Sequence, residues 1–374
     1  MSGLILSGQI NNLRRINESV RDHLKHRNVI IGSVEEGDDN GIITRLGWLQ
    51  YFDFFINRRV KCIVSDTSDN TYVGTSDNRI IKLDSLGTIV WDKSIHSNDV
   101  NDLACDDQGN VYSASDDGTV KKITPDGDVD WTFSGHSGAV RGVDVEGYHI
   151  LTSGPTTSRN VYSCGSDGTV RKLNNSGAEQ WRHEEHGANS VNDVVVDKGL
   201  PGGFDLCVYS VSHDNRLRKI NEEKSGASVS GGVLQSAEEW AYELDGNGRG
   251  VAVDNNRRVY VADEGGKVHK VNPSGTEEWS FEAHMAWAVA VDMNSNVYAG
   301  AGGNGHTTGF NPASGHGAVH KLSSSGQELW KLLVARSGVD AVDISASGHL
   351  LMAGGRDGTA RKINTELQIK GFRL

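Results

Sequence analysis

The chain has 374 residues and a formal net charge of −12, from 31 Asp and 18 Glu against 21 Arg and 16 Lys. This acidic balance argues against a nucleic acid as partner, because affinity for a phosphate backbone depends on clustered cations. The excess of Asp over Glu suits a salty environment, in which repulsion between like charges is screened. The 46 glycines and 5 prolines indicate many tight turns rather than a disordered chain.

Residues 1–56 are predicted to form an N-terminal arm. Apolar residues at spacings of three and four indicate a basic helix over about residues 9–27, and an apolar segment over residues 42–56 follows it. We expect the arm either to fold back on its own propeller or to dock on another protein subunit. A strand marked by Trp48 competes with the C-terminal LQIKGFRL for the outer position of the last blade, and the sequence leaves this choice open. The candidate assembly-docking residues are Ile10, Leu13, Arg14, Arg15, Val20 and Leu24 of the helix, with Trp48 and Phe52 of the apolar segment.

The first residues do not have the pattern of a signal peptide. No cation precedes the short apolar run Leu4–Leu6, and no stretch of the chain reaches the roughly 18 apolar residues of a membrane span. The sequence therefore predicts no membrane insertion. It leaves the location unknown, with a virion and the cytoplasm as the two alternatives.

From residue 57 to residue 374 the chain repeats one unit seven times. The first strand of a unit is apolar, as in VNDVVVD, and the second begins with V-Y and two small residues. After a polar turn, the third strand has the pattern apolar-Lys-apolar, and after a second turn the fourth strand carries Trp. The Asp-Gly pairs in the turns fit tight hairpins. Four short strands in a unit of roughly 40 residues are typical of a propeller blade. We therefore predict an all-β, seven-bladed β-propeller of four-stranded blades, preceded by the helical arm.

Lysine and tryptophan recur at fixed places in the unit, which predicts equivalent packing of the Trp rings in successive blades. The third strand of every unit carries Lys82, Lys122, Lys172, Lys219, Lys270, Lys321 or Lys362. The fourth strand carries Trp91, Trp131, Trp181, Trp240, Trp279 or Trp330, and Gly371 takes this place in the last unit.

The repeated lysines have two interpretations. The structural one is a pair between each lysine and the acid that ends the first strand of six units. The functional one is a ring of cations around the propeller axis that captures an anion. The six acids are Asp66, Asp106, Glu146, Asp197, Asp254 and Asp292.

The repeat resembles two related propeller families. The endings SGTEEW and SGQELW are similar to the quinoprotein-type repeat, while SGHSGAVRGVDV followed by YSCGSDGTVRKL resembles a WD repeat. The resemblance covers about residues 60–374. WD repeats usually end the third strand with Trp, where this chain has aliphatic residues such as Leu83 and Ile123. The adjacent Cys-Cys pair typical of quinoprotein enzymes is absent from the sequence, which argues against that enzyme class.

Residues that carry chemistry in other proteins have structural interpretations here. The resemblance to WD repeats implies a hydrogen bond inside the blade for four histidines that precede the first strands. Asp-rich turns such as PDGDVDW lack the order of a calcium loop, and the four cysteines lack metal-ligand spacing, so free buried thiols are expected. We predict no catalytic residue, no cofactor and no metal. The four histidines are His96, His136, His186 and His284.

Four insertions interrupt the repeat, and insertions are where a repeat protein can carry a binding site. Residues 147–160, 198–207 and 221–239 are predicted on one face of the disc, and residues 302–317 on the opposite face. The alternative is that they are tolerated surface loops. The candidate partner-binding residues are Tyr148, His149 and Phe204 on the first face, and His306, Phe310 and His316 on the second.

Together these features predict a non-enzymatic recognition propeller that docks through its arm on a larger assembly. The main hypothesis is a virion tail or receptor-binding component, whose partners would be other subunits and a cell-surface receptor or glycan. The second hypothesis is an intracellular WD-repeat-like scaffold for protein interactions. The third, a quinoprotein-like enzyme, would require a bound cofactor.

Overall fold

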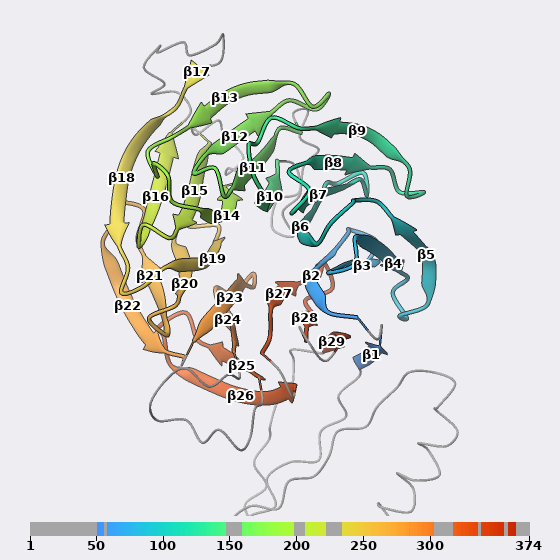
Figure 1. Ribbon diagram of the computed structural model, residues 1–374. Helices are drawn as coiled ribbons and strands as arrows, with labels where there is room; N and C mark the ends of the chain where they lie inside the picture. Colours follow the sequence, from blue (N-terminus) through green and yellow to red (C-terminus); the bar gives the residue numbers. More distant parts are fainter. Residues whose placement is uncertain are drawn as a thin grey trace, which may run out of the picture.

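The computed structural model describes residues 51–55, 58–146, 159–197, 206–221, 234–283, 285–302, 317–335, 338–354 and 358–363. Seven sheets are arranged radially around a central axis, as Figure 1 shows. The first strand of each blade packs beside the first strands of the two neighbouring blades, which closes the ring. The seven-bladed all-β propeller predicted from the repeat is confirmed. The predicted helix over residues 9–27 lies outside the described residues.

Each blade is an antiparallel sheet whose strands follow one another outward from the axis. The strands of blade 1 are β2 (Val60–Ser65), β3 (Thr71–Thr75), β4 (Arg79–Leu83) and β5 (Ile89–Ser94). Those of blade 2 are β6 (Val100–Cys105), β7 (Val111–Ser115), β8 (Val120–Ile123) and β9 (Val129–Phe133). Those of blade 3 are β10 (Val140–Val145), β11 (Val161–Gly165), β12 (Val170–Leu173) and β13 (Glu179–His183). Those of blade 4 are β14 (Val191–Val196), β15 (Cys207–Ser212), β16 (Arg216–Asn221) and β18 (Ala237–Glu243).

The remaining blades have the same order. The strands of blade 5 are β19 (Gly248–Val253), β20 (Val259–Asp263), β21 (Lys267–Val271) and β22 (Glu277–Glu282). Those of blade 6 are β23 (Ala286–Val291), β24 (Val297–Ala301), β25 (Gly317–Leu322) and β26 (Glu328–Ala335). Those of blade 7 are β27 (Ala341–Ile344), β28 (Leu350–Ala353), β29 (Thr359–Ile363) and, as outer strand, β1 (Tyr51–Phe55).

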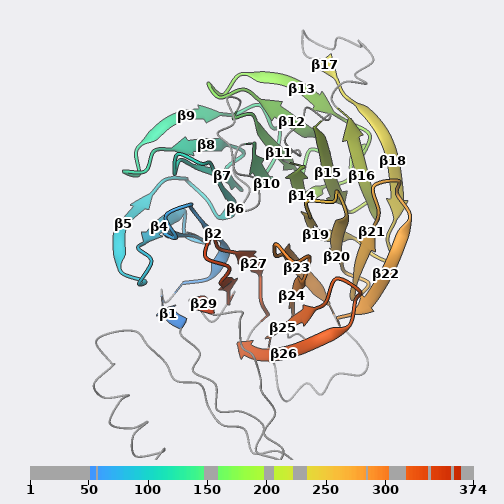
Figure 2. The ribbon, with the colours of Figure 1, turned by 180° about the vertical axis from the view of Figure 1, so that it is seen from behind.

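An N-terminal strand therefore completes the last blade. β1 pairs antiparallel with β29, and Phe52 stands opposite Lys362 (Figure 2). In blade 1 the same register places Trp91 opposite Lys82. Phe52 thus occupies the position that tryptophan holds in the other units. Gly371, which the sequence placed there, lies outside the described residues. The sequence assigned residues 1–56 to the arm, but residues 51–55 form a strand of the propeller. The boundary between arm and propeller therefore lies before residue 51.

The core lies between the blades, because each sheet is apolar on both faces. The second strand is buried at every residue in blades 1, 2 and 3. Continuous burial of this kind is typical of strands covered on two sides. Outer strands such as β5 and β22 alternate between exposed and half-buried residues. In the part of the chain that the structure describes, no helix is long and apolar enough to cross a membrane.

One insertion adds a fifth strand to a neighbouring blade. Strand β17 (Leu234–Gln235) comes from the insertion over residues 221–239 of blade 4. It pairs parallel with β13, the outer strand of blade 3, and places Leu234 opposite Trp181. The outer edge of a blade in this protein can therefore accept another extended segment.

Candidate functional site

The repeated lysines and tryptophans hold neighbouring blades together. In blade 1, Lys82 Nζ donates to the carbonyl oxygen of Pro125 at 3.1 Å, and Trp91 Nε1 donates to the same oxygen at 3.0 Å. Pro125 lies in the turn between the third and fourth strands of blade 2. Blade 5 repeats the arrangement, since Lys270 and Trp279 both donate to the carbonyl oxygen of Ser324 in blade 6, at 2.7 and 3.1 Å. We call this paired donation the Lys–Trp clasp.

The tryptophan rings pack at equivalent points, as predicted. Each lies against the buried tyrosine of the second strand, with ring centroids between 5.9 and 6.1 Å apart in six blades. Trp181 differs in its hydrogen bonding, because its Nε1 is buried without a partner. Strand β17 pairs beside Trp181, with Leu234 opposite it.

The acids that end the first strands have a different role from the one predicted. The phenol of Tyr72 donates to Asp66 at 3.0 Å, and that of Tyr260 donates to Asp254 at 3.0 Å. Lys172 lies 3.8 Å from Glu146, but most of the lysines bind elsewhere. Outer-strand acids, or the turn of the next blade, provide those partners.

The seven lysines also do not surround the axis. Lys122, for example, lies 3.1 Å from Asp130 of its own outer strand. The described residues that line the axial cavity include none of the seven. The hypothesis of an axial ring of lysines is therefore wrong, because the third strand of a blade lies away from the axis (Figure 1).

Three of the four predicted histidines make the expected hydrogen bond inside a blade. His136 Nε2 lies 2.9 Å from Ser163 Oγ, and Nδ1 lies 3.0 Å from Asp167 Oδ2. His96 and His186 have equivalent Ser and Asp partners. Burial lowers the pKa of His96 and of His186, although an aspartate faces each ring. His284 lies outside the described residues.

The axial cavity of about 320 Å³ is lined by the first strands. Three of its carboxylates connect neighbouring blades through the main chain. Asp102 accepts from the amide of Val143 at 2.9 Å, and Asp193 accepts from the amide of Val251 at 2.9 Å. Asp144 binds the next blade in the same way.

Two of the axial carboxylates, Asp102 and Asp193, have raised pKa values. Burial raises the pKa of Asp102 well above its usual range, and the charge of Asp193 adds to the effect. Burial also raises the pKa of Asp193 to about 7, while its hydrogen bonds from main-chain amides act in the opposite direction. The raised pKa values shift both carboxyls toward the protonated form, which reduces charge repulsion around the axis.

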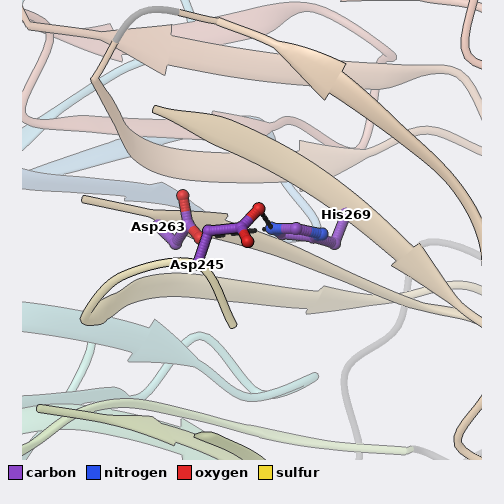
Figure 3. A group of neighbouring side chains, drawn as sticks. All are labelled: Asp245, Asp263 and His269. Atoms are coloured by element: carbon purple, nitrogen blue, oxygen red, sulfur yellow. Dashed lines mark hydrogen bonds and ion pairs between the residues drawn. The ribbon is translucent and has the colours of Figure 1, made fainter. Parts of the chain in front are cut away.

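A group of three ligand-bearing side chains lies at the seam between blades 4 and 5 (Figure 3). His269 comes from β21, Asp263 ends β20, and Asp245 follows β18 on the connection to blade 5. His269 Nε2 lies 3.2 Å from Asp263 Oδ2 and 4.0 Å from Asp245 Oδ2. Sequence reasoning missed this group, since the residues have no recognised spacing and meet only in the folded blade.

The outer edge of blade 1 is apolar. Leu86, Ile89 and Val90 are 76%, 49% and 55% exposed. Ile89 and Val90 directly precede Trp91 on β5. In blade 5 the two residues directly before Trp279 are Glu277 and Glu278. We call Leu86, Ile89 and Val90 the apolar edge. The sequence contained this signal, as an apolar pair where each of the other units that carry the tryptophan has at least one acid.

The predicted partner-binding residues Tyr148, His149, Phe204, His306, Phe310 and His316 lie outside the described residues, as do the docking residues before residue 51. Phe52 lies in β1, where its main chain pairs with β29. The four cysteines are free and buried, as expected.

Comparisons with known proteins place the repeat among propellers. A family described as outer membrane protein assembly factor BamB (PQQ_2) matches residues 56–229 and 166–366. The structure titled "Structure of U3-55K" is 14% identical, with a TM-score of 0.65, and covers 82% of this chain and 95% of the other. "Crystal structure of RRP9 WD40 repeats" is 14% identical, with a TM-score of 0.66, and covers 88% and 99%. No curated protein matches the sequence significantly.

Proposed function

This chain belongs to the family described as outer membrane protein assembly factor BamB, and we propose that it acts as a protein-interaction scaffold and not as an enzyme. The quinoprotein-type and WD-type repeats predicted from the sequence agree with the family and with the similar solved structures. The polar side chains repeated around the disc bind one another or the next blade, as the Lys–Trp clasp and the His–Ser–Asp groups illustrate. These residues stabilise the propeller, so we expect partners to bind its exposed surfaces.

The observation that carries the proposal is the apolar edge of blade 1. An exposed outer strand presents main-chain donors and acceptors that can pair with another chain. Natural edges usually carry charges that discourage such pairing, and blade 5 does so with Glu277 and Glu278. Blade 1 presents Ile89 and Val90 at those positions, with Leu86 in the adjoining turn.

The occupant that fits this edge is an extended segment of a partner protein that adds a strand to β5. β17 on β13 is a precedent for strand addition to a blade of this propeller. Exposed Asp126, Asp128 and Asp130 lie on the turn and outer strand of blade 2, and Lys93 of β5 reaches Asp128 at 3.0 Å. The partner segment should therefore combine apolar residues with flanking Lys or Arg, because opposite charges steer association.

Selection from a displayed library of random peptides tests this proposal. The bait is the full chain, and the matched control is the double variant Ile89→Glu, Val90→Glu, which copies blade 5 and should keep the fold. We expect the wild-type bait to enrich apolar segments with basic flanks and the variant to lose them at least tenfold. Equal enrichment on both baits, or enrichment of acidic peptides, would contradict the proposed edge.

Hydrogen exchange supplies a second measurement with a selected peptide. Amides of β5 should exchange more slowly in the complex, while those of β22 in blade 5 should not change. Protection confined to another surface would place recognition elsewhere on the scaffold.

The finer hypotheses from the sequence stay predictions. Docking through the arm depends on residues outside the described part of the chain. A virion role and a receptor or glycan partner depend on molecules other than this chain. Removal of residues 1–50 tests the arm separately, since a scaffold that binds through β5 should keep its peptide affinity without them.

A further inference from the structure

The side chains of Asp245, Asp263 and His269 offer three ligand atoms that all lie within 4.8 Å of one another (Figure 3). We propose that these residues bind a divalent transition-metal ion of the zinc class at the seam of blades 4 and 5. The site is independent of the apolar edge in blade 1. It would tie the connection after β18 to strands β20 and β21.

The distances fit one ion between the three groups. Zinc binds imidazole nitrogen and carboxylate oxygen at roughly 2.0–2.2 Å, so ligand atoms around one ion lie roughly 3–4 Å apart. His269 Nε2 lies 3.2 Å from Asp263 Oδ2 and 4.0 Å from Asp245 Oδ2. An ion can therefore enter with small side-chain movements.

The imidazole is oriented as in metal sites. His269 Nδ1 lies 2.8 Å from Glu277 Oε2, and the same oxygen accepts from the phenol of Tyr242 at 2.5 Å. Metal-binding histidines commonly donate their other ring N–H to a carboxylate, which fixes the ring and increases the basicity of the ligand nitrogen. Glu277 and Tyr242 thus direct Nε2 toward the two aspartates.

The repeat provides an internal comparison. Arg171 and Arg218 hold the corresponding third-strand position in blades 3 and 4, immediately before Lys172 and Lys219. Arg171 binds Glu179 of its outer strand at 3.1 Å, as His269 binds Glu277. At the position of these two arginines, blade 5 therefore has His269, whose imidazole can bind a proton or a metal ion. Asp245 lies beside it as an additional ligand.

The ligand set determines the class of ion. Calcium and magnesium select oxygen ligands, whereas an imidazole favours zinc and its first-row neighbours. Three protein ligands leave a further position for water. The side chain of Asp245 is 53% exposed, which provides an entry path, and Lys267 Nζ lies 2.6 Å from its Oδ2. This ammonium is the cation that the metal ion must displace.

Calorimetric titration of the full chain with Zn²⁺ tests the proposal, with Mg²⁺ as the control ion. The key variant is His269→Arg, which copies blades 3 and 4 and should fold while losing the site. Asp245→Asn removes an exposed ligand and should weaken binding as well. Glu277→Gln should weaken it roughly 10–100-fold, and Lys267→Gln should strengthen it by removing the competing cation.

Co²⁺ absorption in the visible range reports an imidazole–carboxylate environment directly. We expect a band from the wild type that His269→Arg abolishes. Zn²⁺ binding of the same affinity in the wild type and in His269→Arg would overturn the proposal, as would the absence of Zn²⁺ binding by the wild type. A circular dichroism spectrum identical to that of the wild type shows that each variant is folded.

Discussion

Lys82 and Trp91 stand opposite each other on β4 and β5, and both donate to one carbonyl oxygen, that of Pro125 in the next blade. The ammonium needs a polar partner because Lys82 is only 9% exposed, and the carbonyl supplies it. This relationship explains why the two residue types recur at a fixed spacing. In blades 1, 4 and 5 the lysine and the tryptophan together bind the blade to a turn of the next one.

The two hydrogen bonds of the Lys–Trp clasp should contribute to stability in a coupled way. Trp91→Phe and Lys82→Met each remove one donor and leave the other on Pro125, so each should lower the free energy of unfolding by about 1 kcal/mol. The double variant leaves the carbonyl without either donor and should lose at least about 0.5 kcal/mol more than the sum. Denaturant unfolding of the four proteins measures this coupling. Strict additivity would mean that the two bonds act independently.

Gly127 should be intolerant of a side chain for two separable reasons. Its φ is +83°, and a Cβ would lie 3.0 Å from the side chain of Lys93 and 3.0 Å from the ring of Trp91. Gly348 has a similar φ of +78° but open space around it. Gly348→Ala should therefore cost only the backbone strain, about 1–2 kcal/mol, whereas Gly127→Ala should cost more. The difference between the two melting temperatures measures packing against Trp91 and Lys93, and equal losses would exclude a steric role for these side chains.

The axial carboxylates should make stability depend on pH. Burial holds the pKa of Asp193 at about 7, whereas an unfolded chain has a value of about 3.9. The native state then binds more protons between these values, so stability falls as the pH rises through about 7. The charge of Asp144 adds to the upward shift.

Asp193→Asn removes this titration and keeps one acceptor for a main-chain amide. From about pH 5 to about pH 8, the wild type should lose more than about 1 kcal/mol relative to the variant. Urea midpoints at both pH values provide the measurement. Parallel curves would show that the Asp193 carboxyl is charged throughout.

The N-terminal strand should be necessary for closure. Removal of residues 1–50 keeps β1, whereas removal of residues 1–55 exposes the ladder groups of β29. We expect the second truncation to lower the melting temperature and to promote association, because an exposed edge pairs with other chains. Thermal unfolding and size-exclusion chromatography distinguish the two. Identical behaviour would mean that the pairing of β1 with β29 adds no stability.

Much of the fold could be predicted because local chemistry repeats. The Asp-Gly turns, the V-Y strands and the Lys-to-Trp spacing each indicate a hairpin, and seven copies indicate the radial arrangement. The partners across the seams could not be predicted in this way. Pro125 lies 43 residues after Lys82, and no local pattern connects them. Lysine–carboxylate pairs do form, but Lys122, Lys219 and Lys270 pair with acids of their outer strands, and Lys172 lies near the first-strand acid Glu146. Tyrosines compete for the first-strand acids and turns compete for the lysines.

The sequence by itself determined the number of blades, the strand order within each blade and the equivalence of the tryptophans, because these depend on residues within one repeat. Only the tertiary structure decided that β1 forms an outer strand of blade 7, and that β17 joins a neighbouring blade. It also brought Asp245 to His269 and left the apolar edge of blade 1 at the surface. These outcomes depend on which strands and side chains of neighbouring blades meet, and the closure of the ring determines which blades are neighbours.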